Sequence, residues 1–258
     1  MLDFIKWKNG MWLFMKIKVI TFNMCHGEGV DGVIDIKRQA EFLNKYNPDI
    51  LMLQELDMYT LRVNKQFQLE KMSEYTGLTY KSMCSTIRYK EGFYGIGTLN
   101  KYPIESAVNF PMMSLHPENE RRGILFNKVR IGEKVVNIFN LHFATAEEER
   151  LLAAKELMTI IKTIPKNEII FVGGDFNVGI TKIGKHQYNF EKKESYKEYD
   201  EIGKRLSKLP NTEPTWFSKT AIACIDTIFY SNNVELIDYK TLPSEISDHH
   251  AILAEFEI

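Results

Sequence analysis

The sequence predicts a layered α/β fold, in which two mixed β-sheets pack face to face and carry helices on their outer surfaces. Two observations support this prediction. Each half of the 258-residue chain contains an apolar strand, an amphipathic helix and a second apolar strand. Segments that read as antiparallel hairpins lie between these units. Strands and helices that alternate in this way pack as sheets covered by helices.

The two halves also carry similar polar residues at the ends of their strands. In the first half, KVITFN ends at Asn23 and the next apolar run ends near Glu55. In the second half, VVNIFN ends at Asn140 and the next apolar run ends at Asp175. This pattern indicates a coarse internal duplication. Two such halves packed face to face would bring together, at one end of the molecule, Asn23, Glu55, His142, Asp175 and Asn177.

The elements of the first half follow from their periodicity. Residues 16–23 alternate and predict a strand that presents Asn23 at its tip. Apolar positions recur at helical spacing over 34–46, and Asn47-Pro48 ends that helix. We expect the next strand at 49–56 and a further helix at 66–75, which stops at Gly77.

The remaining elements are read in the same way. Residues 79–130 form short strands, and the apolar positions of 151–161 lie on one face of a helix that ends by Pro165. The charged stretch 182–209 has no strong pattern before 201–209, so we expect a surface insertion that carries one helix. Three strand-like runs follow, at 223–231, 234–242 and 251–258.

The stretch IIFVGGDFNV, Ile169–Val178, reads as a buried strand that ends abruptly at two glycines. Asp175 and Asn177 then lie where the strand opens into a loop. The carboxyl ends of strands in α/β sheets are the usual ligand sites. The alternative is that both side chains only shape the turn. The duplication favours a role in chemistry.

Asp226 is a charged residue inside an otherwise apolar strand, ACIDTIFYS. Buried carboxylates are rare unless they are paired. We expect His249 to be the partner, since a carboxylate on one ring nitrogen fixes the tautomer of a histidine and raises its basicity. A purely structural pair is the alternative. Asp248, a further acid beside the histidine, favours a functional one.

Composition restricts the function classes. A chain with 44% apolar residues and no long linker-like stretch is consistent with one core. The net charge of −1 gives no support to a protein that holds duplex DNA mainly by phosphate attraction. The cysteines, Cys25, Cys84 and Cys224, lack CxxC spacing and imply neither a disulfide framework nor a zinc knuckle.

The N-terminal segment is too interrupted by lysines to span a membrane or to form a signal sequence. We therefore expect a soluble, monomeric protein of the cytoplasm that has no transmembrane segment. Because Met15 directly precedes the first clear strand, the residues before it are interpreted as an extra arm or an upstream start.

Seven motifs in order carry a resemblance to a known family: FNMCHG, LQELD, YGIGTLNKYPI, NLHFA, GGDFNV, IDTIFYS and SDHH. The chain resembles the endonuclease/exonuclease/phosphatase superfamily, the deoxyribonuclease I-like metal-dependent phosphoesterases, and in particular its small bacterial members of unsettled substrate. The resemblance covers Lys16 to Ile258. It implies a four-layer α/β sandwich, with 1–15 as an N-terminal extension and 16–258 as a single domain of this family.

The resemblance also implies a metal site. Glu55 matches the main ligand of a divalent ion, Mg²⁺ or Mn²⁺, with Asn23 and Asp248 nearby. Hard cations of this kind prefer carboxylate and amide oxygens. The number of metal ions, one or two, stays open.

Further matches concern catalysis and phosphate binding. Asp175 and Asn177 match the residues that activate and orient the attacking water and hold the phosphate. His249, paired with Asp226, matches the histidine that contacts the phosphate. The remaining matches are His142 at the rim of the site and Arg122 as the phosphate-binding arginine, with Arg121 as the alternative. His26 and His250 are interpreted as bystanders.

The predicted function is hydrolysis of a phosphodiester by in-line attack of an activated water, dependent on a divalent metal. The near-neutral charge favours a lipid-linked or small substrate, and 182–209 and 57–67 are the segments expected to select it. A nuclease acting on DNA or RNA is one alternative. A catalytically silent binding module is another, although such a module has no need to keep Glu55, Asp175, Asn177, Asp226, Asp248 and His249 together.

Overall fold

The two strand–helix–strand units predicted from the sequence are both present. In the computed structural model, which describes residues 15–184, 187–210 and 213–258, β1 (Lys16–Asn23) and β2 (Ile50–Met58) are parallel and joined through α1 (Ile36–Asn44). β7 (Lys134–His142) and β8 (Ile169–Asp175) are likewise parallel and joined through α3 (Glu147–Ile161). The internal duplication indicated by the sequence is therefore present in the structure.

Each parallel pair lies within a six-stranded mixed sheet. The first sheet has the order β13-β14-β1-β2-β4-β3 and the second has the order β11-β12-β8-β7-β6-β5. The other strands of the first sheet are β3 (Tyr80–Tyr89), β4 (Gly92–Asn100), β13 (Glu235–Leu242) and β14 (Ala251–Glu257). Those of the second are β5 (Ile104–Pro111), β6 (Gly123–Ile131), β11 (Ser207–Lys208) and β12 (Asp226–Tyr230).

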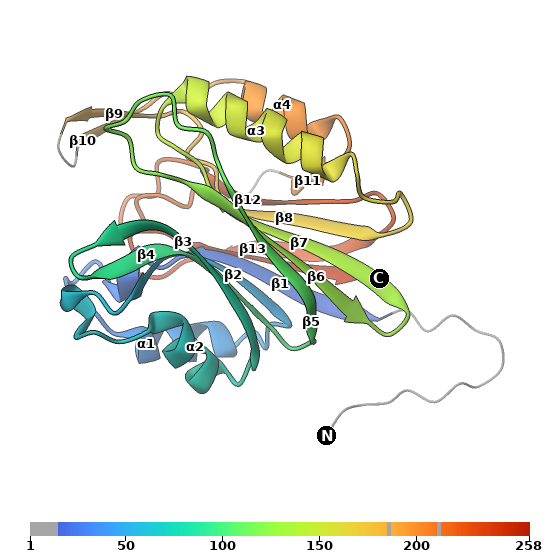
Figure 1. The fold of residues 1–258 in the computed structure, drawn as a ribbon, viewed down its shortest axis with the longest axis horizontal. Helices are drawn as coiled ribbons and strands as arrows, with labels where there is room; N and C mark the ends of the chain where they lie inside the picture. The colour runs from blue at the N-terminus through green and yellow to red at the C-terminus, as the bar shows by residue number, and fades with distance from the viewer. Residues whose placement is uncertain (1–14, 185–186, 211–212) are drawn as a thin grey trace.

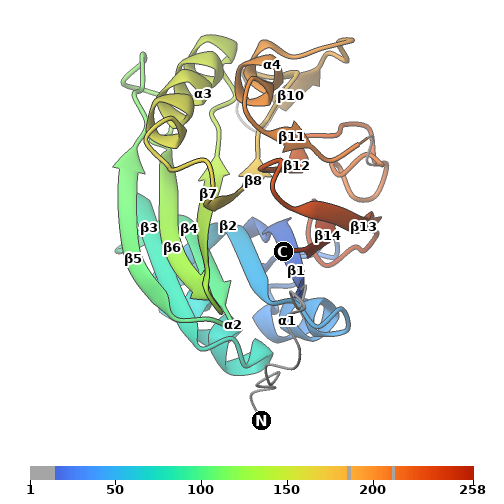
Figure 2. The same cartoon turned by 90° about the vertical axis from the view of Figure 1, so that its right-hand side faces the viewer.

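The layers confirm the predicted sandwich. α3 and α4 (Lys197–Gly203) cover the second sheet, and α1 and α2 (Gln68–Thr76) cover the first (Figure 1). The view turned by 90° shows the same order of helices, sheet, sheet and helices (Figure 2). α2 ends at Gly77 in a left-handed conformation, φ 76°, as predicted. The described residues also form two short 3-10 turns, at Cys25–Gly27 and Leu61–Val63.

Apolar side chains fill the three spaces between the four layers. Phe171 and Phe256, with ring centroids 4.7 Å apart, belong to the core between the sheets. Phe22 and Met72 belong to the core beneath α1 and α2, while Leu157 belongs to the one beneath α3 and α4. All five side chains are fully buried. The central strands β1, β2, β7 and β8 are thus buried on both faces for most of their length.

One polar bridge crosses the core between the sheets. Asn140, at the end of the second Phe-Asn pair, donates to the carbonyl oxygens of Leu53 (3.0 Å) and Gly97 (2.8 Å). Its own side-chain oxygen accepts from Gln54 (2.7 Å). A fully satisfied buried network of this kind favours one arrangement over others. It fixes the second sheet against the residue next to Glu55.

The segment 182–209 carries one helix among its described residues, as predicted, but it differs from the prediction in its other elements. A hairpin, β9 (Ile180–Gly184) and β10 (Gln187–Phe190), was not expected, and α4 begins at Lys197, so that 201–209 is helical only at its start. The cause is tertiary. Arg150 and Glu198 form a buried ion pair (2.8 Å) between α3 and α4, and Tyr199 packs on Phe176. An ion pair and a ring contact hold α4 in place, and neither requires apolar residues at helical spacing. The sequence therefore shows no helical period here.

No helix among the described residues is both long and apolar enough to cross a membrane. The predicted N-terminal extension lies outside the described residues apart from Met15. Met15 pairs through its backbone with Ile258, at 2.9 and 3.0 Å, and so extends the pairing of β1 with β14.

Gly174 is required by close backbone packing. A Cβ atom at this position would lie 1.9 Å from the carbonyl oxygen of Leu141 on the neighbouring strand, and its φ is 155°. We expect Gly174→Ala to lower the free energy of unfolding by more than about 3 kcal/mol, as measured by urea denaturation. Gly132→Ala, where nothing lies within 4 Å and φ is 60°, should cost about 1 kcal/mol. Equal costs would contradict this account.

Candidate active site

The polar residues predicted to meet do so at the carboxyl ends of the two parallel strand pairs. Asn23 ends β1, and Glu55 lies in β2 of the same sheet. His142 ends β7 and Asp175 ends β8, directly opposite each other in the second sheet. This is the edge of an α/β sheet at which ligands usually bind. The two sheets thus contribute two residues each.

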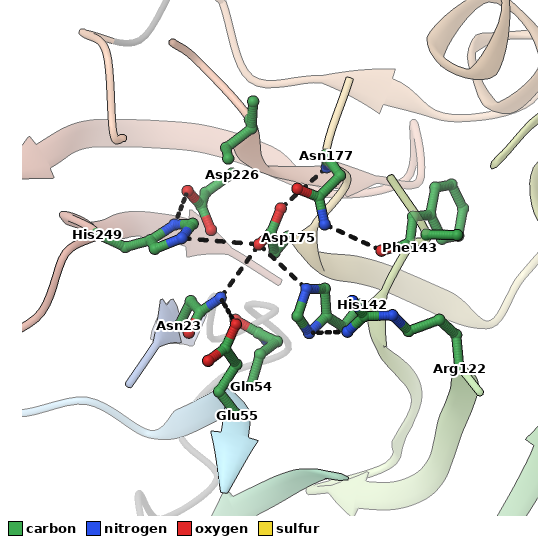
Figure 3. A network of polar contacts seen from close by, with 12 residues as sticks. Asn23, Gln54, Glu55, Arg122, His142, Phe143, Asp175, Asn177, Asp226 and His249 are labelled. Atoms are coloured by element: carbon green, nitrogen blue, oxygen red, sulfur yellow. Dashed lines mark hydrogen bonds and ion pairs between the residues drawn. The ribbon is translucent and has the colours of Figure 1, made fainter. Parts of the chain in front are cut away.

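Glu55 is turned into the site by a β-bulge. The register of β2 against β4 shifts between Leu53 and Leu56, and Glu55 has a left-handed backbone, φ 59°. An extra residue in a strand redirects its side chains. The side-chain amide of Asn23 then donates to both Glu55 (3.1 Å) and Asp175 (3.1 Å), so it connects the acids of the two halves (Figure 3).

The amide of Asn23 presents its nitrogen, not its oxygen, to the acids. Its oxygen accepts the backbone N–H of Cys25 (3.1 Å). In this arrangement Asn23 orients Glu55, and direct binding of a cation by Asn23 requires the amide to rotate.

Asp175 lies at the centre of the network (Figure 3). One carboxylate oxygen accepts the backbone N–H of Asn177 (2.9 Å). The other lies 3.3 Å from Nε2 of His142 and 3.8 Å from Nε2 of His249. Burial, followed by the negative charge of Asp226, raises the pKa of Asp175 to about 7. A carboxylate with this pKa is suited to accept a proton near neutral pH.

His142 is held neutral. Its Nδ1 lies 2.8 Å from the guanidinium of Arg122, which can only donate, so the ring proton is on Nε2 and faces Asp175. Burial, together with the positive charge of Arg122, lowers the pKa of His142 well below its usual value. Arg122 also pairs with Glu120 (3.0 Å). Its neighbour Arg121 is exposed, so Arg122 is the arginine that lies in the site.

Asp226 pairs with His249, as its position in an apolar strand predicted. Nδ1 of His249 lies 2.9 Å from a carboxylate oxygen of Asp226, which also accepts the hydroxyl of Thr215 (2.6 Å). Burial opposes a charge on His249. The charges of Asp226 and Asp248 outweigh it and hold the pKa of His249 well above its usual value. His249 is therefore an imidazolium whose Nε2 proton faces Asp175.

Asn177 both shapes the turn after β8 and stays at the site. Its backbone is left-handed, φ 49°, and its side-chain nitrogen donates to the carbonyl of Phe143 (3.0 Å). The amide has a second N–H group. The two interpretations of Asn177 from the sequence are thus compatible.

The donors near Glu55 fit a divalent cation. Burial, and then the charge of nearby Asp248, raises the pKa of Glu55. A carboxyl group whose charge is opposed by a neighbouring carboxylate is stabilised by a cation that both can bind. The hydroxyl of Ser247 lies 3.4 Å from Asp248. Glu55 and Asp248 are therefore the residues here that suit Mg²⁺ or Mn²⁺.

Sequence reasoning missed several neighbours of the site. Thr215 and Glu120 come from loops whose sequences carry no periodic signal. His250 points away as expected and accepts the backbone N–H of Ser244 (3.1 Å). His26 lies closer than expected, since one of its ligand atoms is within 4.8 Å of those of Glu55 and Cys25.

The four-layer fold and this cluster of carboxylates, histidines and arginine define a hydrolase of phosphate esters of the deoxyribonuclease I-like class. Residues 20–249 match the model of the Endonuclease/Exonuclease/phosphatase family. The chain belongs to that family, and its members are metal-dependent phosphoesterases.

Solved structures confirm the fold. An endonuclease/exonuclease/phosphatase from Beutenbergia cavernae has a TM-score of 0.74 at 16% identity, with 94% of this chain and 72% of that chain covered. A mannosyl-6-phosphatase from Bacteroides thetaiotaomicron has a TM-score of 0.69 at 18% identity, with 93% and 99% covered. D. rerio TDP2 in complex with a single-strand DNA product has 0.68 at 16% identity, with 94% and 99% covered. No curated protein matches the sequence significantly.

Proposed function

We propose that this protein hydrolyses a phosphodiester by in-line attack of a water molecule, with the help of a divalent metal. The observation that carries the proposal is the position of Asp175. This carboxylate, with a pKa of about 7, is surrounded by the donors His142, His249 and Asn23 and lies beside the Glu55 and Asp248 pair. Acceptor and donors thus converge on one point.

Asp175 is proposed to take the proton of the attacking water. The backbone N–H of Asn177 fixes one of its oxygens (2.9 Å), and the other faces the two histidines. The second amide hydrogen of Asn177 is proposed to orient the water or the phosphate. A positioned base of matched pKa accelerates such reactions by about 10²–10⁴-fold.

The phosphate oxygens are proposed to bind His249, His142 and Arg122. His249 is charged and carries its proton on Nε2 because Asp226 occupies Nδ1. Arg122 is a permanent cation with a side chain only 12% exposed. Preorganised donors of this kind stabilise charge that develops in the transition state.

Glu55 and Asp248 are proposed to hold Mg²⁺ or Mn²⁺, with Asn23 orienting Glu55. When bound, such an ion would stabilise the negative charge that develops on the phosphate oxygens.

The insertion 182–209 is proposed to select the substrate. Phe190, Tyr196 and Lys208 of this segment line a cavity of about 630 Å³ that reaches Asp226. Next to it, Tyr188 packs on Trp216 (ring centroids 5.9 Å apart), which in turn lies near His249. This rim exposes apolar surface, with Tyr188 39%, Phe217 42% and Ile222 49% exposed. An apolar rim with lysines beyond it suits a lipid-linked or small phosphodiester.

Two of the basic residues that could follow a nucleic-acid backbone, Arg62 and Lys65, are paired with acids. Arg62 donates from Nε and Nη2 to the two carboxylate oxygens of Asp57, at 2.5 and 2.8 Å. Nζ of Lys65 lies 3.5 Å from the carboxylate of Glu91. Binding that depends on phosphate attraction needs unpaired cations. This favours a small or lipid-linked substrate over duplex DNA.

A nuclease is the second candidate. The structural neighbour with a single-strand DNA product favours it, as do the exposed residues Arg88, Lys90 and Arg121.

A substrate screen at physiological salt with Mg²⁺ or Mn²⁺ tests the proposal. The panel comprises bis-p-nitrophenyl phosphate, sphingomyelin, phosphoinositides, single-stranded RNA and supercoiled plasmid, with Asp175→Asn as the inactive control. We expect turnover of a small or lipid-linked diester to exceed nicking of the plasmid. Efficient plasmid nicking that Asp175→Asn abolishes would make the nuclease the better assignment. Absence of turnover on the whole panel would favour a binding module.

A further inference from the structure

A thiol and an imidazole lie beside Glu55, at a position where hard oxygen ligands were expected. The ligand atoms of Cys25, His26 and Glu55 are all within 4.8 Å of one another. Cys25 and His26 belong to the turn that follows β1, and Glu55 belongs to the bulge of β2. The first strand pair therefore brings sulfur, nitrogen and oxygen ligands to one point.

His26 has the partner that metal-bound histidines usually have. One ring nitrogen, Nε2, lies 3.0 Å from the carboxylate of Glu28. The side chain of His26 is only 13% exposed. A carboxylate on one ring nitrogen fixes the tautomer and leaves the other nitrogen as a lone-pair donor. The ring is thus held in place before any ion binds.

Cys25 lies close to both acids that are proposed to bind magnesium. Its thiol hydrogen-bonds to Asp248, and the charges of Glu55 and Glu28 are also close to it. A fourth possible ligand, a carboxylate oxygen of Asp248, is therefore near the sulfur, nitrogen and oxygen atoms of the other three residues. The surroundings of the thiol are acidic, which favours a bound cation.

This set of ligands suits a different ion from magnesium. Cysteine sulfur and histidine nitrogen are ligands of Zn²⁺ and of Co²⁺, whereas Mg²⁺ is bound by oxygen in octahedral geometry. Tetrahedral zinc with bonds of 2.0–2.3 Å places its ligand atoms about 3.3–3.8 Å apart. The spacing here, within 4.8 Å, requires only small side-chain rotations.

We infer that the protein binds Zn²⁺ through Cys25, His26 and Glu55, and that zinc bound there inhibits by taking Glu55 from magnesium. The binding part of this inference stands on the ligand geometry. The inhibitory part rests on the proposed function, in which Glu55 holds the catalytic ion.

Binding is tested without any measurement of activity. Co²⁺ added to the metal-free protein should give the near-ultraviolet charge-transfer absorption of a cobalt thiolate, and Zn²⁺ should abolish it. Competition with a chromogenic chelator gives the zinc affinity. We expect Cys25→Ser to lose the absorption and to weaken zinc binding about 100-fold or more. Cys224→Ser, the matched control, should keep both. Wild-type absorption and affinity in Cys25→Ser would overturn the inference.

Inhibition is tested on the best substrate of the screen. We expect micromolar or lower zinc to inhibit the magnesium-supported reaction. Cys25→Ser and His26→Gln should require about 10-fold more zinc or more for half-inhibition, with each variant compared to its own rate in magnesium alone. The two failures are distinguishable. A cobalt thiolate signal without hydrolysis of any substrate contradicts the proposed function only. Hydrolysis with equal zinc sensitivity in wild type and Cys25→Ser contradicts the inhibition only.

Discussion

Glu55→Gln should lower the affinity for magnesium by about 100-fold or more and reduce the rate of hydrolysis correspondingly. The change keeps the size of the side chain and the acceptor for Asn23, which lies 3.1 Å from Glu55. It removes only the charge. Titration of magnesium by calorimetry measures the affinity, and kcat/KM at rising magnesium measures the rate.

Glu28→Gln is the matched control for Glu55. Glu28 is also an acid near the site, but it is 41% exposed and contacts His26. We expect its affinity for magnesium to stay at the wild-type value. A Glu55→Gln variant that binds magnesium as tightly as wild type would refute the assignment of Glu55 as the main ligand.

Asp175→Asn should reduce kcat/KM by about 10³–10⁴-fold while leaving the affinity for magnesium nearly unchanged. An asparagine still fills the space between His142 and His249 and still accepts the N–H of Asn177. It cannot take a proton from water. The measurement is kcat/KM at saturating magnesium on the best diester of the screen.

A graded comparison strengthens this prediction. Asp226→Asn leaves the Asp175 carboxylate in place and removes the charge that holds His249 protonated and that also raises the pKa of Asp175, so we expect a smaller loss of about 10²-fold. If Asp175→Asn is more active than Asp226→Asn, Asp175 is not the base.

The strands and helices of both halves were predictable for two reasons. The central strands, buried on both faces, are nearly continuous apolar runs that end at polar or turn residues, and the helices carry apolar residues at helical spacing. β1 ends at Asn23 as expected, although its burial alternates only over its first residues, and Gly77 ends α2. The pairing of Asp226 with His249 was also predictable, because an isolated carboxylate in an apolar strand demands a partner. These predictions start from a signal in the local sequence: an apolar run, a stop residue, or a charge inside an apolar strand.

Features set by distant contacts were not predictable. The hairpin of β9 and β10 is largely exposed, with Ile183 66% exposed, so its sequence carries no pattern of burial. The left-handed backbone of Glu55 follows from a bulge that pairing with β4 defines. The choice of Arg122 over Arg121 required the position of His142. In each case the deciding partner lies far away in the sequence.

The position of β14 has a consequence for the order of events during folding. This strand follows all other described strands in the sequence, yet it lies inside the first sheet, between β13 and β1. In the pairing of β1 with β14, Lys16 lies opposite Glu257. Contacts between such distant residues form slowly, because a long loop must close first.

Before β14 has been synthesised, one edge of β1 is therefore open, and open strand edges invite aggregation. His249 and Asp248 directly precede β14 and are not yet in position at that stage. A nascent chain of this protein should thus be inactive and prone to association. Its hydrolytic activity should appear in the same step that closes the exposed edge.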